Sequence, residues 1–291
     1  MTSLYKNPTA KQTVMDLYDE KLNSLSIPYE SIEVVTSFGN THIIKTGNPH
    51  GEKIVLFHGI NAGAPLALEA VKMLREKYLL YAIDTIGQAT RSAENPIQIQ
   101  DDSYARWAAE TIEKLEISSA HFIGISYGSF ILQKVITHRP QLVKKCIFVV
   151  PSGLVNGSFF SSVTQLTFPL MKFMMTKKDE HLRNFLNAFV PKNDTFMFRL
   201  QKALLTGVHI DYRRPALLTK EEVKNFNSPV YIMVADSDLF FPGDAAVKKA
   251  QKIFNNLRGI HYLKNSLHIP AHSDYTEIQN VILKWLEQKE G

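Results

Sequence analysis

The stretch AHFIGISYGSF, from Ala120 to Phe130, places one serine between two glycines in the pattern G-x-S-x-G. An apolar, strand-like run ends at Ser126, and a helical pattern follows it. This order of strand, sharp turn and helix predicts a nucleophile elbow, in which Ser126 has strained backbone geometry and its hydroxyl stands clear of the sheet. Side chains at Gly124 and Gly128 would collide with neighbouring backbone. The alternative is a structural serine in a tight turn.

Apolar strands and helices alternate on both sides of this turn. The expected strands after the turn-rich start are 53–59, 78–84, 120–126, 144–151, 228–238 and 259–265, and the expected helices are 8–24, 65–77, 101–115, 127–138, 243–255 and 275–290. Strands that are apolar throughout are typical of a parallel sheet buried on both faces. Two earlier strands, 31–37 and 40–46, meet at a Gly-Asn turn and predict an antiparallel hairpin. We therefore predict an α/β fold.

The segment 155–224 breaks this alternation, because it is helical, aromatic and rich in methionine but has no clear strand. We interpret it as a helical cap inserted over the carboxyl edge of the sheet, where open α/β sheets bind their ligands. The predicted organisation is a first part of the core at 1–154, the cap at 155–224 and a second part of the core at 225–291.

The composition excludes several classes of protein. The 291 residues are 45% hydrophobic and 21% charged, as in globular proteins, and the net charge of +5 is spread without a run of like charges. We expect no nucleic-acid partner. The apolar stretch 158–175 is interrupted by Gln165, Pro169 and Lys172, so we expect no integral membrane association. The polar N-terminal segment lacks the apolar core of a secretory signal, and we expect a cytoplasmic protein.

A single cysteine, Cys146, lies in an apolar run. A lone cysteine forms no disulfide framework, and in this setting it is a buried thiol rather than a nucleophile. This usage fits a reducing compartment. The sequence leaves the oligomeric state open, with a homodimer among the alternatives.

A serine hydroxyl needs a base to attack, and the base needs a carboxylate to orient it. Asp236 and Asp238 come at the carboxyl end of the expected strand, directly after its apolar run 228–235, and His268 and His272 follow the next strand. We prefer Asp238, because it lies in the loop beyond the strand, and His268, because it stands nearer the strand end. Asp236 and His272 stay as alternatives. The two histidines could also suggest a metal site, but Pro270 between them disfavours the helix that would align them, and we expect no metal.

Two backbone N–H groups should donate hydrogen bonds to the oxyanion that develops during the attack. One belongs to Tyr127, directly after the candidate nucleophile, and the other to Ile60, in the glycine-rich loop HGINAGAP after the strand at 53–59. We expect the His58 side chain to brace that loop by hydrogen bonding rather than to act as a base.

The cap segment carries a soft apolar surface. Its members are Phe159, Phe160, Leu166, Phe168, Met171, Phe173, Met174 and Met175. Most should pack within the cap itself, and we expect a few of them, Phe168 and Met171 in particular, to face the pocket and bind an apolar acyl or alcohol group.

These motifs together resemble the α/β-hydrolase family over nearly the whole chain. LFHG, GISYGS, VADSDLFFP and SLHIPAH stand in the family's order, and the chain is similar to bacillus-type carboxylesterases with a helical cap. The resemblance implies the α/β-hydrolase fold, with a mostly parallel eight-stranded sheet, helices on both faces and a cap. It also implies a triad of Ser126, Asp238 and His268, and an oxyanion hole of Ile60 and Tyr127. The expected activity is a carboxylesterase without cofactor that acts on a small-molecule ester.

Other chemistries remain open beside ester hydrolysis. Dehalogenases and epoxide hydrolases of this fold need an acid in place of Ser126, which argues against both. Thioesterase, lactonase, amidase, carbon–carbon hydrolase and perhydrolase reactions use the same residues, and the sequence does not rank them. A non-catalytic receptor or interaction protein that keeps only the fold is the alternative from a different class.

Overall fold

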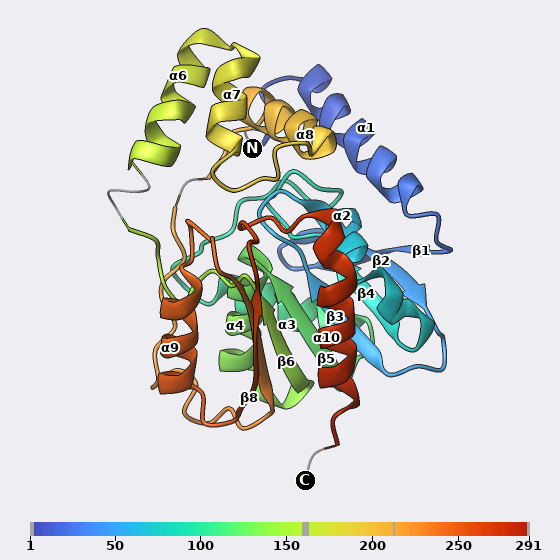
Figure 1. Cartoon of the computed structure of the whole chain (residues 1–291). Helices are drawn as coiled ribbons and strands as arrows, with labels where there is room; N and C mark the ends of the chain where they lie inside the picture. The colour runs from blue at the N-terminus through green and yellow to red at the C-terminus, as the bar shows by residue number, and fades with distance from the viewer. Residues whose placement is uncertain (1–2, 159–162, 212, 290–291) are drawn as a thin grey trace.

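The computed structural model describes residues 3–158, 163–211 and 213–289 (Figure 1). One eight-stranded sheet runs through it in the order β1-β2-β4-β3-β5-β6-β7-β8. The strands are β1 (Glu30–Thr36), β2 (Gly39–Gly47), β3 (Lys53–Phe57), β4 (Leu79–Ile83), β5 (Ala120–Ile125), β6 (Val143–Val149), β7 (Val230–Ala235) and β8 (Leu257–Leu263). β2 pairs antiparallel with β1 and β4, and the other neighbours pair parallel, which confirms the predicted fold class.

Helices cover both faces of this sheet. One apolar core contains side chains of α3 (Ser103–Lys114), α4 (Tyr127–His138) and α9 (Gly243–Ile253). A second core, on the other face, contains side chains of α2 (Gly63–Val71) and α10 (Tyr275–Glu287). Every residue of β4 and β7 is buried, because each of these strands has a neighbour on both sides and helices on both faces.

Three further helices lie between β6 and β7 in the chain: α6 (Phe168–Thr176), α7 (Asp179–Leu186) and α8 (Thr195–Gly207). A π-helical turn, η3 (Val163–Thr167), precedes them. In Figure 1 they lie above the sheet beside the N-terminal helix α1 (Pro8–Ser24). The inserted helices share a third apolar core with α1. From the sequence, α1 was expected to belong only to the first part of the core, 1–154.

Helix α1 joins the two regions because it has two apolar sides. Tyr18 and Leu22 pack into the core on the sheet, whereas Val14 and Leu17 pack against the inserted helices. An isolated bridge between Tyr5 and Val208 also ties the start of the chain to the end of α8. Within the described residues, no helix is both long enough and apolar enough to span a bilayer.

Candidate active site

Ser126 lies at the sharp turn between β5 and α4 and has a backbone that L-residues rarely adopt. Its φ is 51° and its ψ is −114°. The turn is held on both sides, because Ser126 N–H donates to Val149 O at 2.9 Å and Ser126 O accepts from the N–H groups of Ser129 and Ser152. Such strain persists only where the surrounding structure over-determines it, and it is common at reactive residues.

The two glycines that flank Ser126 are required by close backbone contacts. A Cβ on Gly128 would lie 2.1 Å from Phe57 O, and a Cβ on Gly124 would lie 2.7 Å from Gly128 O. Both distances are far below van der Waals contact and involve backbone atoms that cannot rotate away. The expected collisions at both positions are therefore confirmed.

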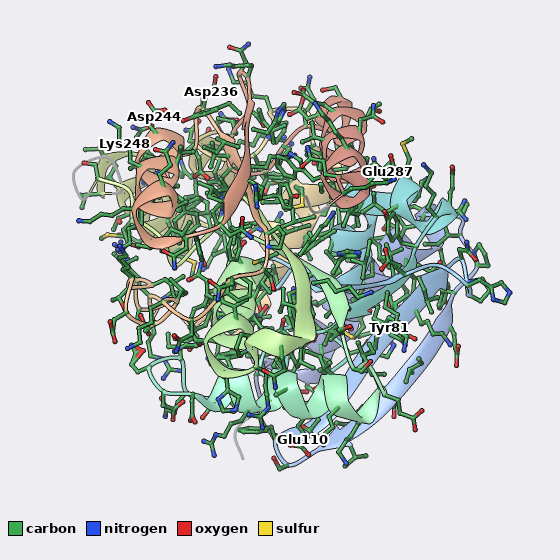
Figure 2. The ribbon with its side chains drawn as sticks, turned by 90° about the horizontal axis from the view of Figure 1, so that it is seen from below. Tyr81, Glu110, Asp236, Asp244, Lys248 and Glu287 are labelled. Carbon is green, nitrogen blue, oxygen red and sulfur yellow. The ribbon has the colours of Figure 1, made fainter. Side chains whose placement is uncertain are left out.

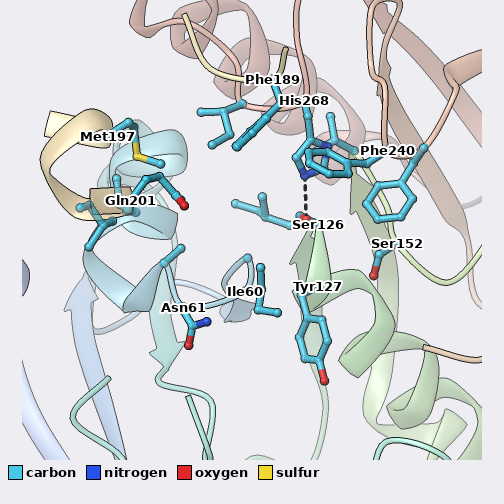
Figure 3. A pocket seen from close by; sticks show the side chains of 18 of the residues that line it. Ile60, Asn61, Ser126, Tyr127, Ser152, Phe189, Met197, Gln201, Phe240 and His268 are labelled. Carbon is cyan, nitrogen blue, oxygen red and sulfur yellow. Dashed lines mark hydrogen bonds between the residues drawn. The ribbon is translucent and has the colours of Figure 1, made fainter. Parts of the chain in front are cut away.

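His268 stands directly beside the serine hydroxyl (Figure 3). Ser126 Oγ lies 2.9 Å from His268 Nε2, and His268 Nδ1 lies 2.7 Å from Asp238 Oδ2. The imidazole is buried in the loop after β8, and the rings of Phe240 and Phe241 contact its ring edge to face. With Nδ1–H donating to the carboxylate, Nε2 is free to accept the proton of the hydroxyl.

Asp238 uses both carboxylate oxygens. Its Oδ2 faces His268, while Oδ1 accepts the backbone N–H groups of Phe240 and Phe241 at 2.8 and 3.0 Å. The side chain is buried and held in one orientation, so the carboxylate in turn orients the imidazole. The two phenylalanine N–H groups are partners that the sequence analysis did not identify, although the D-x-F-F spacing permits such a turn.

The alternative acid and base lie elsewhere. Asp236 is exposed at the periphery of the molecule (Figure 2). The N–H of Asn265 donates to its carboxylate and lowers its pKa. His272 is 57% exposed and sits 3.8 Å from Glu69 and 3.9 Å from Asp194. The structure thus brings Asp238 and His268 to Ser126, and it does not bring Asp236 or His272 there.

The candidate oxyanion donors lie on either side of Ser126. Tyr127 is the first residue of α4, so its N–H has no carbonyl partner within the helix. Ile60 follows β3 in the loop that passes Ser126, where a Cβ on Gly59 would lie 3.5 Å from Ser126 Cβ. Both residues line the cavity above the sheet (Figure 3).

His58 fixes the orientation of this loop. Its Nε2 accepts the Thr85 N–H at 2.9 Å, so Nδ1 carries the proton and donates to Gly59 O at 2.6 Å. Because the carbonyl and the N–H of a trans peptide point in opposite directions, this bond also sets the direction of the Ile60 N–H. Burial lowers the pKa of His58 and keeps the imidazole neutral. The expectation that His58 braces the loop is confirmed.

A cavity of ≈ 480 Å³ lies between the sheet edge and the inserted helices. Its apolar lining includes Leu66, Leu166, Leu170, Phe185, Phe189, Phe196, Met197 and Leu200, and Gln201 adds an amide (Figure 3). Sequence reasoning did not single out Phe189, Met197 or Gln201, because the helical period shows that a helix has faces but not which face covers a cavity.

Phe168 and Met171 do not line this cavity. Their side chains are 66% and 55% exposed. Leu166 of the π-helical turn η3 and Leu170 of α6 line the cavity instead. The expectation for Phe168 and Met171 is therefore corrected, because these two side chains are exposed outside the cavity. Phe159 and Phe160 lie outside the described residues.

Cys146 is buried in β6, and burial raises the pKa of its thiol. The expectation of a buried thiol is confirmed. Within the described part of the chain, no group of three or more His, Cys, Asp or Glu side chains is arranged to hold a metal ion.

Comparisons with known proteins agree with the fold described above. A family model described as alpha/beta hydrolase fold matches residues 53–209. The chain is similar to an uncharacterized carboxylesterase, nap, of Bacillus subtilis, with 21% identity over 94% of this chain and 92% of the relative. It is also similar to carboxylesterase YbfK of the same organism, with 21% identity over 92% of each chain. The crystal structure of naproxen esterase from Bacillus subtilis superposes with a TM-score of 0.82 and 18% identity, over 97% of this chain and 100% of that one.

Proposed function

Since the chain belongs to the α/β-hydrolase family, we propose that it is a serine hydrolase that cleaves carboxylic esters through an acyl-enzyme intermediate. The observation that carries the proposal is the continuous chain of short contacts from Ser126 Oγ through the His268 ring to Asp238. A hydroxyl, a base and an orienting carboxylate in this geometry are the parts that nucleophilic acyl transfer needs.

In the first half of the reaction, Ser126 Oγ attacks the ester carbonyl carbon and His268 Nε2 takes its proton. The Ile60 and Tyr127 N–H groups donate to the oxyanion of the tetrahedral intermediate. When the intermediate collapses, the carbon–oxygen bond to the alcohol breaks, and His268 returns the proton to the leaving oxygen. The acyl group stays on Ser126.

In the second half, water attacks the acyl-enzyme and gives its proton to His268 Nε2. The same two N–H groups stabilise the second oxyanion, and the acid leaves as Ser126 Oγ recovers its proton. Asp238 keeps the imidazole in the Nδ1–H tautomer throughout and stabilises its charged form. No cofactor enters the scheme.

Two observations support an ester with an apolar part as the substrate. The similar proteins of Bacillus subtilis are named carboxylesterases and span almost the whole chain. The cavity next to Ser126 is lined mainly by apolar side chains, which would bind an apolar acyl or alcohol group. We further propose that the inserted helices act as a cap over this site, with 155–224 as the inserted segment.

Steady-state hydrolysis of short p-nitrophenyl esters tests the proposal. We expect wild-type enzyme to turn over the butyrate ester and Ser126→Ala to lose turnover by about 10⁴-fold or more. Matched thioester and anilide substrates establish whether the ester is preferred. An unchanged rate in Ser126→Ala would overturn the proposal.

A further inference from the structure

A buried ion pair forms part of the cavity wall. Lys21 on α1 and Glu69 on α2 both line the cavity, and Lys21 Nζ lies 2.8 Å from Glu69 Oε1. Their side chains are only 8% and 17% exposed. Neither residue belongs to the group formed by Ser126, His268 and Asp238, and neither was singled out from the sequence.

The second oxygen of this carboxylate has no partner. Glu69 Oε2 is buried and accepts no hydrogen bond from any residue that the structure describes. A buried carboxylate oxygen without a donor costs free energy, so such atoms are normally satisfied by water or by a ligand. Glu69 itself lines the cavity, and a rotation of its carboxylate about the soft Cγ–Cδ bond would present this oxygen to a donor on a molecule bound there.

The charges at this end of the cavity favour a cation as that donor. Asp194 also lines the cavity, and its Oδ1 caps α8 by accepting the Met197 N–H. Lys21 Nζ is already engaged by Glu69 and by the face of the Phe196 ring, 4.3 Å away. The two carboxylates and the one ammonium together carry a net charge of −1, and the His272 imidazole lies 3.8 Å from Glu69 and 3.9 Å from Asp194. A bound cation would bring this sum to zero, whereas an anion would meet two carboxylates.

We propose that this end of the cavity binds a protonated amine of the substrate, with Glu69 Oε2 accepting its N–H. The inference rests on the proposed hydrolase function and narrows its substrate class to amino esters: carboxylic esters that carry an ammonium group apart from the scissile bond. The apolar lining between Glu69 and Ser126 holds the hydrocarbon that joins the two groups.

Isosteric ester pairs test the amine site. In each pair, a protonated dimethylamino group replaces an isopropyl group of the same shape, at the end of a tether of two, four or six methylenes, in either the alcohol or the acyl part. At the best tether length, wild-type enzyme should favour the amine in kcat/KM by about 10- to 100-fold, the range of a hydrogen bond to a charged group. An ester with a terminal carboxylate should be hydrolysed more slowly than either.

Glu69→Gln is the decisive variant. It should reduce the preference for the amine to about one, measured as the ratio of kcat/KM for the two esters of a pair. Glu76→Gln, an exposed glutamate on the 3-10 turn η1 (Lys72–Glu76) directly after α2, is the matched control and should keep the full preference. If Glu69→Gln loses turnover of both esters because Lys21 is left unpaired, Lys21→Met/Glu69→Gln replaces it with the same expectation.

The outcomes separate the two proposals. Turnover of both esters without preference for the amine at any tether length, or a preference that survives in Glu69→Gln, overturns the amine site and leaves the hydrolase proposal standing. Faster turnover of the carboxylate ester also overturns it. No turnover of any ester by wild-type enzyme overturns both proposals.

Discussion

The Ser126 hydroxyl and the His268 imidazole meet at 2.9 Å, although 142 positions separate them in the chain. The parallel sheet explains the meeting. Ser126 follows β5 and His268 follows β8, and parallel strands end at the same edge of a sheet. Open α/β folds bind their ligands at this edge.

Asp238→Asn should impair catalysis far more than Asp236→Asn. An amide at position 238 no longer selects the Nδ1–H tautomer of His268, so we expect kcat to fall by about 10⁴-fold. Asp236 is exposed and accepts a hydrogen bond from the Asn265 N–H instead of contacting His268. The kcat of Asp236→Asn should therefore stay within about threefold of wild type. Steady-state kinetics of both variants on one ester decides the matter, and the opposite ranking would reassign the acid.

Gly128→Ala should destabilise the fold. The new Cβ would overlap Phe57 O, so β3 and α4 would have to separate, at a cost of about 1 to 3 kcal/mol or more in the free energy of unfolding. Gly59→Ala is the control, because its nearest non-neighbouring atom would be 3.5 Å away, an ordinary contact. Urea unfolding measures both variants. Equal stability of the two would contradict the packing described for the elbow.

His58 should make the protein less stable as pH falls below neutrality. Burial lowers its pKa in the folded state. Below about pH 6.5 the His58 imidazole therefore binds a proton in the unfolded chain but not in the folded one. The free energy of unfolding should therefore decline as pH falls from about 6.5 toward the folded pKa, by up to about 1.4 kcal/mol per pH unit. Urea unfolding at several pH values should show a shallower decline in His58→Asn. If the free energy of unfolding declined with the same slope against pH in both proteins, the lowered pKa of His58 would be contradicted.

Phe189→Ala and Met197→Ala should change the preferred ester chain length. Both side chains line the cavity, and their truncation enlarges it, so longer acyl or alcohol chains should gain in relative kcat/KM by about tenfold. Phe168→Ala and Met171→Ala are matched controls of the same residue types, because their side chains are exposed outside the cavity. A shift in preference produced by the control pair alone would assign the substrate contacts to Phe168 and Met171 instead.

The sequence was sufficient for the parts of the fold that depend on local patterns. The helices expected at 8–24 and 127–138 have those bounds in the structure. The single helix expected at 65–77 is instead α2 followed by the 3-10 turn η1. Helix α2 begins at Gly63, before Pro65, because the Asp84 carboxylate accepts the Ala64 N–H at 2.8 Å. No local sequence pattern encodes this tertiary contact.

In the candidate site, too, some residues could be predicted from local patterns and others could not. Ser126, Asp238 and His268 follow strands, so their approach at one edge of the sheet could be expected from the sequence, although Asp236 and His272 stayed as alternatives. The cavity lining could not, because the choice between Leu170 and Met171 depends on how α6 is rotated above the sheet. The ion pair between Lys21 and Glu69 joins two helices that are distant in sequence, and only the packed structure brings them together.

Covalent labelling of Ser126 tests the central claim most directly. A fluorophosphonate reacts at an activated serine by losing fluoride, and mass spectrometry of the digested protein locates the adduct. We predict one adduct on the peptide that contains Ser126 in wild-type protein, formed at the rate at which ester turnover is lost, and no adduct in Ser126→Ala. An unlabelled, inactive wild-type protein, or an adduct that persists in Ser126→Ala together with ester turnover, would contradict the account.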